Sequence, residues 1–357
     1  MVRRPSAAGA TQLAHVLLLR GDGAASRRIP LGATPLRIGR GQQNDLVLPS
    51  PDVSRQHCAM SVQDAAAVLT DLGSTNGVHV DGARVAGHAV LHPGARIAVG
   101  PYALVYHRGS AEELAQAEAA EHELARAVSY IEALLPSPLH EGKVRAEWRF
   151  VPSAQLGGDA FGYRWLDEQR FAMFLLDVTG HGVGSALLAA SAANMLRAHA
   201  FAADPADPVA VLGALNAAFQ MDDHNGLFFS IWYGVYDAGR RVLRYASAGQ
   251  HPAYLATPAL QPLATRAPAI GMMPEARFLG SEVAVPPGSR LHLFSDGAFE
   301  VPLPDGRMGT VADFVALLAG PARPGQTEPD RLFQAVRELT GRRPFDDDVS
   351  LITLAFP

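Results

Sequence analysis

A stretch rich in alanine and glutamate, residues 110–135, divides the chain into two parts with different apolar patterns. It begins with Ser110-Ala111-Glu112-Glu113, which matches the capping box that starts many helices. Its apolar residues recur at intervals of four, three and four, as one helix face requires: Leu124, Val128, Ile131 and Leu135. Pro136 and Pro138 mark its expected end, because proline cannot continue a helix. The sequence therefore predicts a helical linker, at residues 110–138, between two domains.

The apolar face of this linker helix is narrow and has to be covered. It can pack on the following domain or on a second copy of the same helix, and the sequence leaves both possibilities open. A narrow stripe is typical of paired helices. We therefore expect a homodimer that forms through residues 111–135.

The part before the linker, residues 12–108, consists of short apolar runs separated by Gly, Asn, Asp and Pro. These turn-forming residues return at close intervals, and no segment has a convincing helical period. The pattern predicts an all-β sandwich of short strands.

The part after the linker, residues 139–357, mixes strands with helices. The expected strands are Arg145–Val151, Arg170–Leu176, Phe228–Tyr236, Val242–Ala246, Arg290–Phe294 and Val349–Phe356. The expected helices are residues 184–200, 208–219, 311–318 and 328–339. This order predicts an α+β layered sandwich with helices outside the β-sheets.

The composition is that of a folded protein, with 48% hydrophobic and 18% charged residues. Cys58 is the chain's only cysteine, which excludes an internal disulfide and fits a reducing compartment. No uncharged apolar run approaches the roughly 20 residues of a membrane span. Residues 1–108 are net basic and the rest is net acidic, which indicates either an anion-binding and a cation-binding half or simple scatter of surface charge. We expect a cytoplasmic protein that binds neither membranes nor nucleic acids.

Four aspartates stand where apolar segments start or stop, each beside a glycine or another acidic residue: Asp159, Asp177, Asp296 and Asp347. Carboxylates from separate segments repel one another unless a cation neutralises them, and Mg²⁺ and Mn²⁺ prefer such oxygen ligands. Two ions roughly 3.5–4 Å apart can activate water for attack on phosphorus. Taken singly, each aspartate could instead belong to a turn or a solvated cluster. Together they indicate a metal-dependent phosphate hydrolase.

Three loop motifs in the first part carry side chains suited to phosphate: Gly39-Arg40, Ser54-Arg55-Gln56-His57 and Ser74-Thr75-Asn76-Gly77. Arg40 and Arg55 can fork onto phosphate oxygens. The Ser54 hydroxyl can donate a hydrogen bond, and the Asn76 amide can hold a peptide backbone. A phosphate group requires such convergent donors because it carries nearly two negative charges.

In this order and spacing, the three motifs resemble the forkhead-associated (FHA) domain, a reader of phosphothreonine peptides. The resemblance extends from Leu36 to about Val105. It implies an FHA-like sandwich, at residues 12–108, with these phosphopeptide-binding residues: Arg40, Ser54, Arg55, Thr75 and Asn76. His57 is expected to support its loop and not to bind the ligand. The alternative is a sandwich retained only for docking within the chain.

The second part resembles the bacterial SpoIIE-like branch of the metal-dependent protein phosphatases (PPM), which are related to the type 2C enzymes. The resemblance rests on segments in family order: Gly157-Gly158-Asp159, Asp177-Val178-Thr179-Gly180-His181-Gly182, Ala246-Ser247-Ala248-Gly249, Phe294-Ser295-Asp296-Gly297 and Asp346-Asp347-Asp348-Val349-Ser350. It implies a phosphatase domain, at residues 139–357, in which two Mn²⁺ or Mg²⁺ ions are held by the catalytic carboxylates and one carbonyl: Asp159, Asp177, Val178, Asp296 and Asp347. Asp347 is favoured over Asp346 and Asp348 by its spacing to Val349-Ser350, and a shift of one residue stays open.

The chain departs from this family pattern at two points. Gly162 stands where family members often carry a second aspartate, and no arginine matches the one that anchors the substrate phosphate in the eukaryotic branch. His181 could serve as a general acid, since histidine titrates near neutrality, or could simply form part of its turn.

Together the two resemblances imply a signalling phosphatase that hydrolyses phosphoserine or phosphothreonine on proteins, with an FHA module for targeting or regulation. The expected partners are phosphorylated proteins, among them a Ser/Thr kinase or an anti-sigma-antagonist type of protein. We also consider that capture of a phosphopeptide switches activity through the linker helix. The alternative is a catalytically weak adaptor that uses both domains only to bind phosphoproteins.

Overall fold

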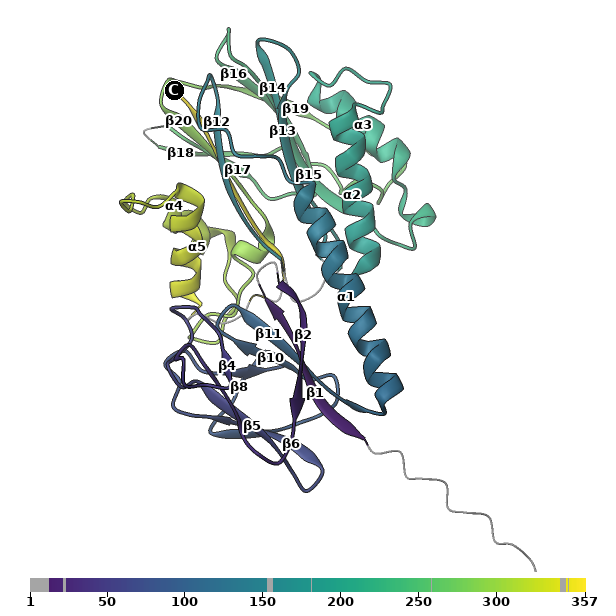
Figure 1. Ribbon diagram of the computed structural model, residues 1–357. Coiled ribbons are helices and arrows are strands. Elements are labelled where there is room, and N and C mark those ends of the chain that lie inside the picture. The colour runs from purple at the N-terminus through teal and green to yellow at the C-terminus, as the bar shows by residue number, and fades with distance from the viewer. Residues whose placement is uncertain are drawn as a thin grey trace, which may run out of the picture. The chain divides into compact units, whose positions relative to one another are not determined.

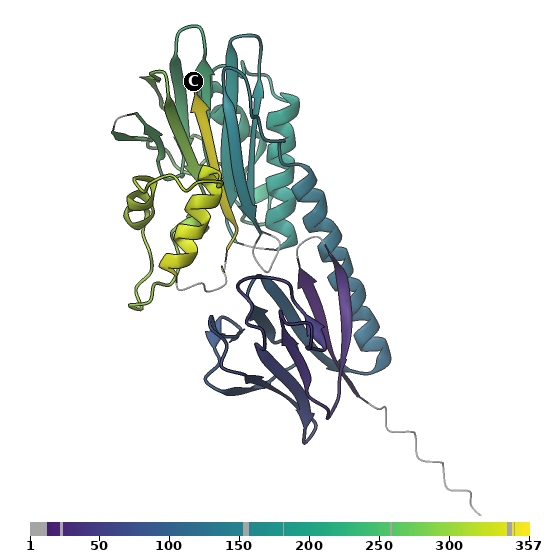
Figure 2. The ribbon, with the colours of Figure 1, turned by 60° about the vertical axis from the view of Figure 1, so that its left-hand side comes forward.

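The computed structural model describes residues 13–21, 24–152, 157–180, 182–257, 259–340, 345 and 347–357. The chain forms two compact units, one from the chain up to Ser129 and the other from residues 130–341 and 345–357. Each unit has its own hydrophobic core, and Figures 1 and 2 show the elements of both.

The first unit is a sandwich of two β-sheets around one core. Its strands are β1 (Ala14–Gly21), β2 (Ala24–Leu31), β3 (Leu36–Gly39), β4 (Leu46–Val47), β5 (Cys58–Gln63), β6 (Ala66–Asp71), β7 (His79–Val80), β8 (Ala83–Arg84), β9 (His88–Leu91), β10 (Arg96–Val99) and β11 (Tyr102–Gly109). One sheet has the order β2-β1-β11-β10-β7-β8 and the other β4-β3-β5-β6-β9. Leu17 and Ile97 of the first sheet share a buried cluster with Ile38, Met60 and Leu69 of the second. The predicted all-β sandwich is confirmed.

Helix α1 (Ala111–Ala133) follows the sandwich. The Ser110 amide donates to Glu113 Oε2 at 2.7 Å, and the Glu113 amide donates to Ser110 Oγ at 3.3 Å. These two bonds are the capping box that the sequence predicts. The side chains of Leu124, Val128 and Ile131 lie outside the described residues, so the dimer through this helix stays a prediction. None of the helices within the described ranges is both long enough and apolar enough to cross a membrane.

The second unit has two β-sheets with helices outside them (Figures 1 and 2). One sheet contains, in this order, β12 (Arg145–Val151), β21 (Val349–Phe356), β20 (Ser289–Phe294), β17 (Ala253–Ala256) and β18 (Leu260–Leu263). The other contains β13 (Asp159–Trp165), β14 (Arg170–Val178), β15 (Phe229–Asp237), β16 (Val242–Ala248) and β19 (Gly280–Ala284). The helices are α2 (Val183–Ala198), α3 (Pro208–Ala218), α4 (Val311–Leu318) and α5 (Glu328–Leu339), with 3₁₀ helices η1 (Met221–Asp223) and η2 (Asp296–Ala298). The predicted layered sandwich is confirmed.

Strand β14 is buried on both faces, which explains its continuous apolar sequence. Successive side chains of a strand point to opposite faces. Met173 and Leu175 therefore face the core between the two sheets, while Phe174 and Leu176 face the core under α2 and α3. Helices α4 and α5 close a further core against the other sheet. Asp177, near the end of β14, breaks this apolar run at one edge of the unit.

Candidate functional site

The predicted aspartates come together from separate segments of the second unit. Asp159 is the first residue of β13, and the strand register places it directly opposite Asp177 of β14. Asp296 opens η2 after β20, and Asp347 and Asp348 immediately precede β21. Side chains directly opposite in an antiparallel pair have Cβ atoms about 4.5–5.5 Å apart. Asp159 and Asp177 are thus neighbours although they are distant in the chain.

Burial and mutual repulsion raise the pKa values of the aspartates in this cluster. Burial, followed by the charges of Asp177 and Asp348, raises the pKa of Asp159 well above its ordinary value. Burial, followed by the charges of Asp296 and Asp347, raises the pKa of Asp177 to about 8. The pKa of Asp296 is raised to about 6 by burial and then by the Asp347 charge. Each shift has the sign expected for carboxylates that share a poorly hydrated region without a counter-charge.

The donor set of this cluster suits a hard divalent cation. It consists of carboxylate oxygens, which Mg²⁺ and Mn²⁺ prefer. Within the described ranges, no three acidic, histidine or cysteine side chains converge into a ready-made cage around one point. Like charges favour separation when nothing neutralises them, and a bound cation would remove that repulsion. The chemistry of the residues therefore fits the two ions that the family resemblance implies.

Three glycines allow the loops of the cluster to approach one another. A side chain at Gly157 would meet the Asp348 carboxylate, and one at Gly158 would meet the Val178 carbonyl oxygen. The Val178 amide also donates to the Gly158 carbonyl at 3.1 Å. At Gly297 a Cβ atom would meet the backbone carbonyl of Asp348. The glycines beside Asp159 and Asp296 are therefore required by close backbone approach.

Two serines position Asp159 from the opposite sheet. The Ser350 hydroxyl donates to Asp159 Oδ2 at 2.6 Å, and both groups are buried. The Ser350 amide donates to Ser295 Oγ at 2.9 Å, and the Ser295 hydroxyl donates to the Asp348 carbonyl at 3.1 Å. Hydrogen bonds from Ser350 and Ser295 favour the charged carboxylate of Asp159 and partly offset the effect of burial. Sequence reasoning missed these positioning serines, although both stand in the matched segments.

Asp348 and Glu300 also border the cluster, and sequence reasoning did not select either of them. Asp348 is buried and its charge acts on Asp159 and Asp177, whereas Asp347 is exposed and its charge acts on Asp177 and Asp296. The exposed Glu300 carboxylate acts on Asp177 and Asp296 as well. Asp346, which precedes Asp347 in the chain, and His181, from the turn after β14, lie outside the described residues. The acidic run before β21 therefore contributes two carboxylates to the cluster, one exposed and one buried.

The departure at Gly162 has a steric reason. Gly162 pairs with Phe174 across β13 and β14, and a Cβ atom at Gly162 would meet the Phe174 ring. The ring thus occupies the space that a side chain at this position would need. No accessory carboxylate can be accommodated at position 162 without moving Phe174.

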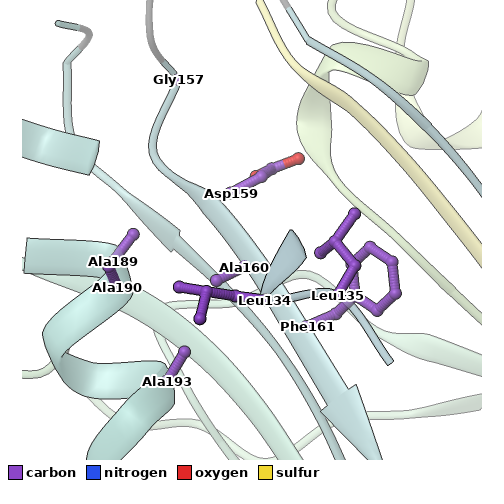
Figure 3. Close-up of a pocket in the computed structure, with 9 residues that line it drawn as sticks. All are labelled: Leu134, Leu135, Gly157, Asp159, Ala160, Phe161, Ala189, Ala190 and Ala193. Carbon is purple, nitrogen blue, oxygen red and sulfur yellow. The ribbon is translucent and has the colours of Figure 1, made fainter. Parts of the chain in front are cut away.

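The segment that follows helix α1 reaches the neighbourhood of Asp159. Leu134 and Leu135 line a small hollow with Asp159, Phe161 and alanines of helix α2 (Figure 3). Leu135 also packs against the core between the two sheets. The end of the linker is therefore part of the wall next to a site carboxylate.

In the first unit, the three predicted loop motifs are joined by hydrogen bonds. The Arg40 amide donates to the Ser54 carbonyl at 3.0 Å, and the Thr75 amide donates to Ser54 Oγ at 3.0 Å. The Asn76 side-chain amide donates to the Asp52 carbonyl at 2.8 Å. The structure thus brings Arg40, Ser54, Thr75 and Asn76 to one loop cluster, with the Arg40 side chain exposed.

Two buried side chains hold this loop cluster in shape. His57 Nδ1 accepts from the Ser54 amide at 3.0 Å, so its Nε2 carries the proton and donates to the Gly77 carbonyl at 3.1 Å. Burial lowers the pKa of His57, which favours this neutral form. The Asn44 side-chain amide donates to the carbonyls of Gly41 and Arg55, each at 2.7 Å. His57 supports its loop as expected, and the role of Asn44 is one that sequence reasoning missed.

Comparison with known proteins finds a matching family for each of the two units. Residues 167–357 match the family described as Stage II sporulation protein E (SpoIIE), and residues 36–100 match the FHA domain. Phosphoserine phosphatase RsbP of Bacillus subtilis is 29% identical over 186 residues, which cover 50% of this chain and 45% of that protein. The FHA domain-containing protein FhaB of Mycolicibacterium smegmatis is 34% identical over 88 residues, which cover 25% of this chain and 57% of that protein.

Among solved structures, the SiaA-PP2C domain of Pseudomonas aeruginosa matches with a TM-score of 0.59 at 24% identity. The match covers 68% of this chain and 99% of that domain, and it shows a common fold. The chain spans less than two thirds of the length of the curated relatives given above. Since the sporulation-protein match covers more than half of its residues, the chain belongs to the SpoIIE family, and it carries an FHA domain ahead of the family region.

Proposed function

We propose that this chain is a metal-dependent protein-serine/threonine phosphatase with an N-terminal phosphothreonine-binding module. The observation that carries the proposal is the meeting of Asp159, Asp177 and Asp296 with the acidic pair before β21, from four separate segments, in one partly buried region. A protein retains such a repulsive cluster at a cost in stability, and cation binding is its ordinary reason.

The carboxylates of Asp159, Asp177, Asp296 and Asp347, with the Val178 carbonyl and the added Asp348, would hold two Mn²⁺ or Mg²⁺ ions. When bound, two such ions supply an activated water and neutralise the charge that develops on the phosphoryl group. Ser350 holds the Asp159 carboxylate in one orientation through its 2.6 Å hydrogen bond. The glycines at 157, 158 and 297 keep the loops close enough for the carboxylates to act on one group.

Direct attack by water is the reaction that the side chains favour. Cys58, the chain's only cysteine, is buried in the FHA unit, where burial raises its pKa to about 12. A thiol that stays protonated is a poor nucleophile. The proposed reaction therefore transfers the phosphoryl group to water without a phosphoenzyme.

For the FHA unit we propose phosphothreonine-peptide binding by Arg40, Ser54, Arg55, Thr75 and Asn76. The exposed guanidinium groups of Arg40 and Arg55 supply charge-assisted donors for a phosphate. Hydrogen bonds already join the loop of Thr75 and Asn76 to the loop of Ser54, so these side chains present a preformed surface. A preformed surface lowers the conformational cost of capturing a peptide.

The proposed partners are phosphorylated proteins: a phosphothreonine protein such as a Ser/Thr kinase at the FHA unit, and a phosphoserine or phosphothreonine substrate at the acidic cluster. The name of the relative RsbP, a phosphoserine phosphatase, supports phosphoserine as the substrate class. An anti-sigma-antagonist type of protein is one such substrate. We propose a cytoplasmic location on the basis of the single, buried and reduced cysteine.

Hydrolysis of p-nitrophenyl phosphate by the purified chain, with EDTA and then with added Mn²⁺, tests the phosphatase proposal. The expected result is turnover that requires Mn²⁺. Binding of Mn²⁺ without any turnover of this substrate or of a phosphoserine peptide would favour the catalytically weak adaptor instead.

A further inference from the structure

A second cavity of the phosphatase unit, of about 240 Å³, lies away from the acidic cluster. Its wall includes basic and aromatic side chains: Tyr163, Arg164, Phe174, Arg197, His199 and Tyr233. Arg164 pairs with Ala172 across β13 and β14, about five residues along the strands from the Asp159–Asp177 pair. At about 3.4 Å per residue the two places are roughly 17 Å apart. The cavity is therefore separate from the proposed catalytic site.

Arg197 gives this cavity a positive charge, and no described carboxylate pairs with it. It lies in the last turn of α2 and is half-buried. Throughout the described ranges, its guanidinium has neither a hydrogen-bond acceptor nor a carboxylate partner. Burial lowers the pKa of Arg197, which reflects the cost of removing this cation from water. A half-buried cation without a partner is stabilised when an anion enters beside it.

Two further basic groups face the same space. The Arg164 guanidinium donates to the backbone carbonyl of Arg197, which fixes it at the C-terminal end of α2. His199 follows this helix in the left-handed backbone region, with φ of 50°. Burial, followed by the Arg164 charge, lowers the pKa of His199, which favours the neutral imidazole. An anion in the cavity would meet two guanidinium groups and one imidazole.

The remaining groups of the wall do not cancel this charge. Among the described residues, no acidic side chain lines the cavity; the charge of Asp204 acts on Tyr233, and Asp204 itself lies outside the wall, where its Oδ1 accepts from the Ala206 amide at 2.9 Å. The Tyr233 hydroxyl donates to the Pro205 carbonyl at 2.8 Å, and the Tyr163 hydroxyl donates to the Ser137 carbonyl at 2.8 Å. Both phenol groups are thus occupied by backbone carbonyls, and their rings form the apolar part of the wall.

We propose that this cavity binds a small organic anion in which a carboxylate or phosphate-type group is attached to a flat ring. The planar guanidinium fork matches the oxygens of such a group, while the aromatic wall accepts the ring. The volume lies below the range of about 300–1,000 Å³ that is usual for drug-sized ligands. The ligand is therefore expected to be a single-ring molecule and not a peptide.

Isothermal titration calorimetry of the full chain with phenylphosphonate and benzoate tests this site. Phenylphosphonate cannot be hydrolysed by a phosphatase because its ring is joined to phosphorus by a carbon bond. The titrations are done in EDTA, which removes metal from the acidic cluster. They use a chain that carries Arg40→Ala, which removes the proposed phosphate-binding site of the FHA unit. Saturable binding of at least one probe, with much weaker binding of uncharged benzyl alcohol, is expected.

Arg197→Gln should weaken this binding at least about tenfold, since hydrogen bonds to charged groups contribute about 1.5–3 kcal/mol. Its guanidinium has no partner to lose within the described ranges, so the melting temperature in the absence of the probe should not fall. Arg290→Gln, at an exposed arginine of β20 in the other sheet, is the matched control and should bind like the parent. Equal binding by Arg197→Gln and the parent, equal binding of benzyl alcohol, or no saturable binding of either anion at millimolar concentration would overturn the proposal.

Discussion

Asp159 faces Asp177 directly across the β13–β14 pair, and the Ser350 hydroxyl donates to the Asp159 carboxylate from the opposite sheet. Like charges directly opposite in a sheet are destabilising, and here Asp159 is buried while Asp177 is half-buried. Carboxylates from both sheets therefore repel one another at this edge of the unit. Its consequences can be measured in activity, in metal binding and in stability.

Asp177→Asn should abolish metal-dependent turnover, because it removes a negative ligand at the centre of the acidic cluster. We expect a loss of at least about 100-fold in kcat, within the range for removing a group that stabilises transition-state charge. Hydrolysis of p-nitrophenyl phosphate at saturating Mn²⁺ measures it. Asp305→Asn, at an exposed aspartate of the same unit, is the control and should keep its activity. Activity of Asp177→Asn within twofold of the parent would contradict the two-metal assignment.

Without metal, the free energy of unfolding should fall as the pH rises from about 5 to about 8. The folded-state pKa of Asp177 is raised to about 8, above its unfolded value of 3.8. In this window the unfolded chain has released a proton that the folded chain still holds, so rising pH favours unfolding. The loss should exceed about 1.4 kcal/mol, the equivalent of one pKa unit. Saturating Mn²⁺ should remove it.

Denaturant unfolding of the parent and of Asp177→Asn at both pH values separates this effect from that of the buried histidines. The pKa values of His251 and His292 are lowered by burial to about 4, so their contribution is lost as the pH falls below 6.5. They act in the opposite direction and are unchanged in the variant. A pH dependence that Asp177→Asn leaves as steep as before would exclude Asp177 as its source.

Ser350→Ala should weaken Mn²⁺ binding about 10- to 100-fold, the usual cost of losing a group that orients a metal ligand. The carboxylate of Asp159 would lose the hydroxyl that fixes it, although the ligand itself remains. Calorimetric titration with Mn²⁺ measures the effect, and turnover should recover at high Mn²⁺ concentration. Ser289→Ala removes a buried hydroxyl that bonds to the Pro286 carbonyl, and it should leave Mn²⁺ affinity unchanged. Unaltered affinity in Ser350→Ala would show that the hydrogen bond is only structural.

Arg40→Ala should weaken binding of a phosphothreonine peptide by about 1.5–3 kcal/mol, the contribution of a hydrogen bond to a charged group. Arg37→Ala, at an exposed arginine of the adjoining strand, should have little effect. Fluorescence polarisation with phosphorylated and unphosphorylated peptides measures both. Turnover of p-nitrophenyl phosphate should stay at the parental level in each variant. A peptide array without preference for phosphothreonine would refute the assignment of a reader.

Replacing Val128 and Ile131 by glutamate should convert the expected homodimer into monomers. The two changes place like charges on the narrow apolar face of the linker helix. Light scattering at micromolar concentration gives the oligomeric state. A parent chain that is already monomeric under these conditions would rule out the dimer.

Much of the second unit could be predicted from local pattern alone. The bounds of β12 and β21 and of helices α4 and α5 agree with the sequence-based expectations. These segments have clear apolar periods bounded by proline, glycine or capping residues. Strand β13 was not predicted, because Gly162 and Arg164 interrupt its apolar run. It forms because β14 offers it a paired edge and the Phe174 ring covers Gly162.

The sequence by itself determined the two domain families, the order of their motifs and four of the acidic residues in the cluster. These features depend on residue type and spacing, which a linear chain records directly. Only the tertiary structure decided that Asp348 is buried beside Asp159 while Asp347 stays exposed, and that Ser350 orients Asp159. Neighbouring residues in an acidic run have nearly the same spacing to every motif, so spacing cannot tell them apart. Their roles are set by which loop lies against them, and that depends on the packing of two sheets whose strands are distant in the chain.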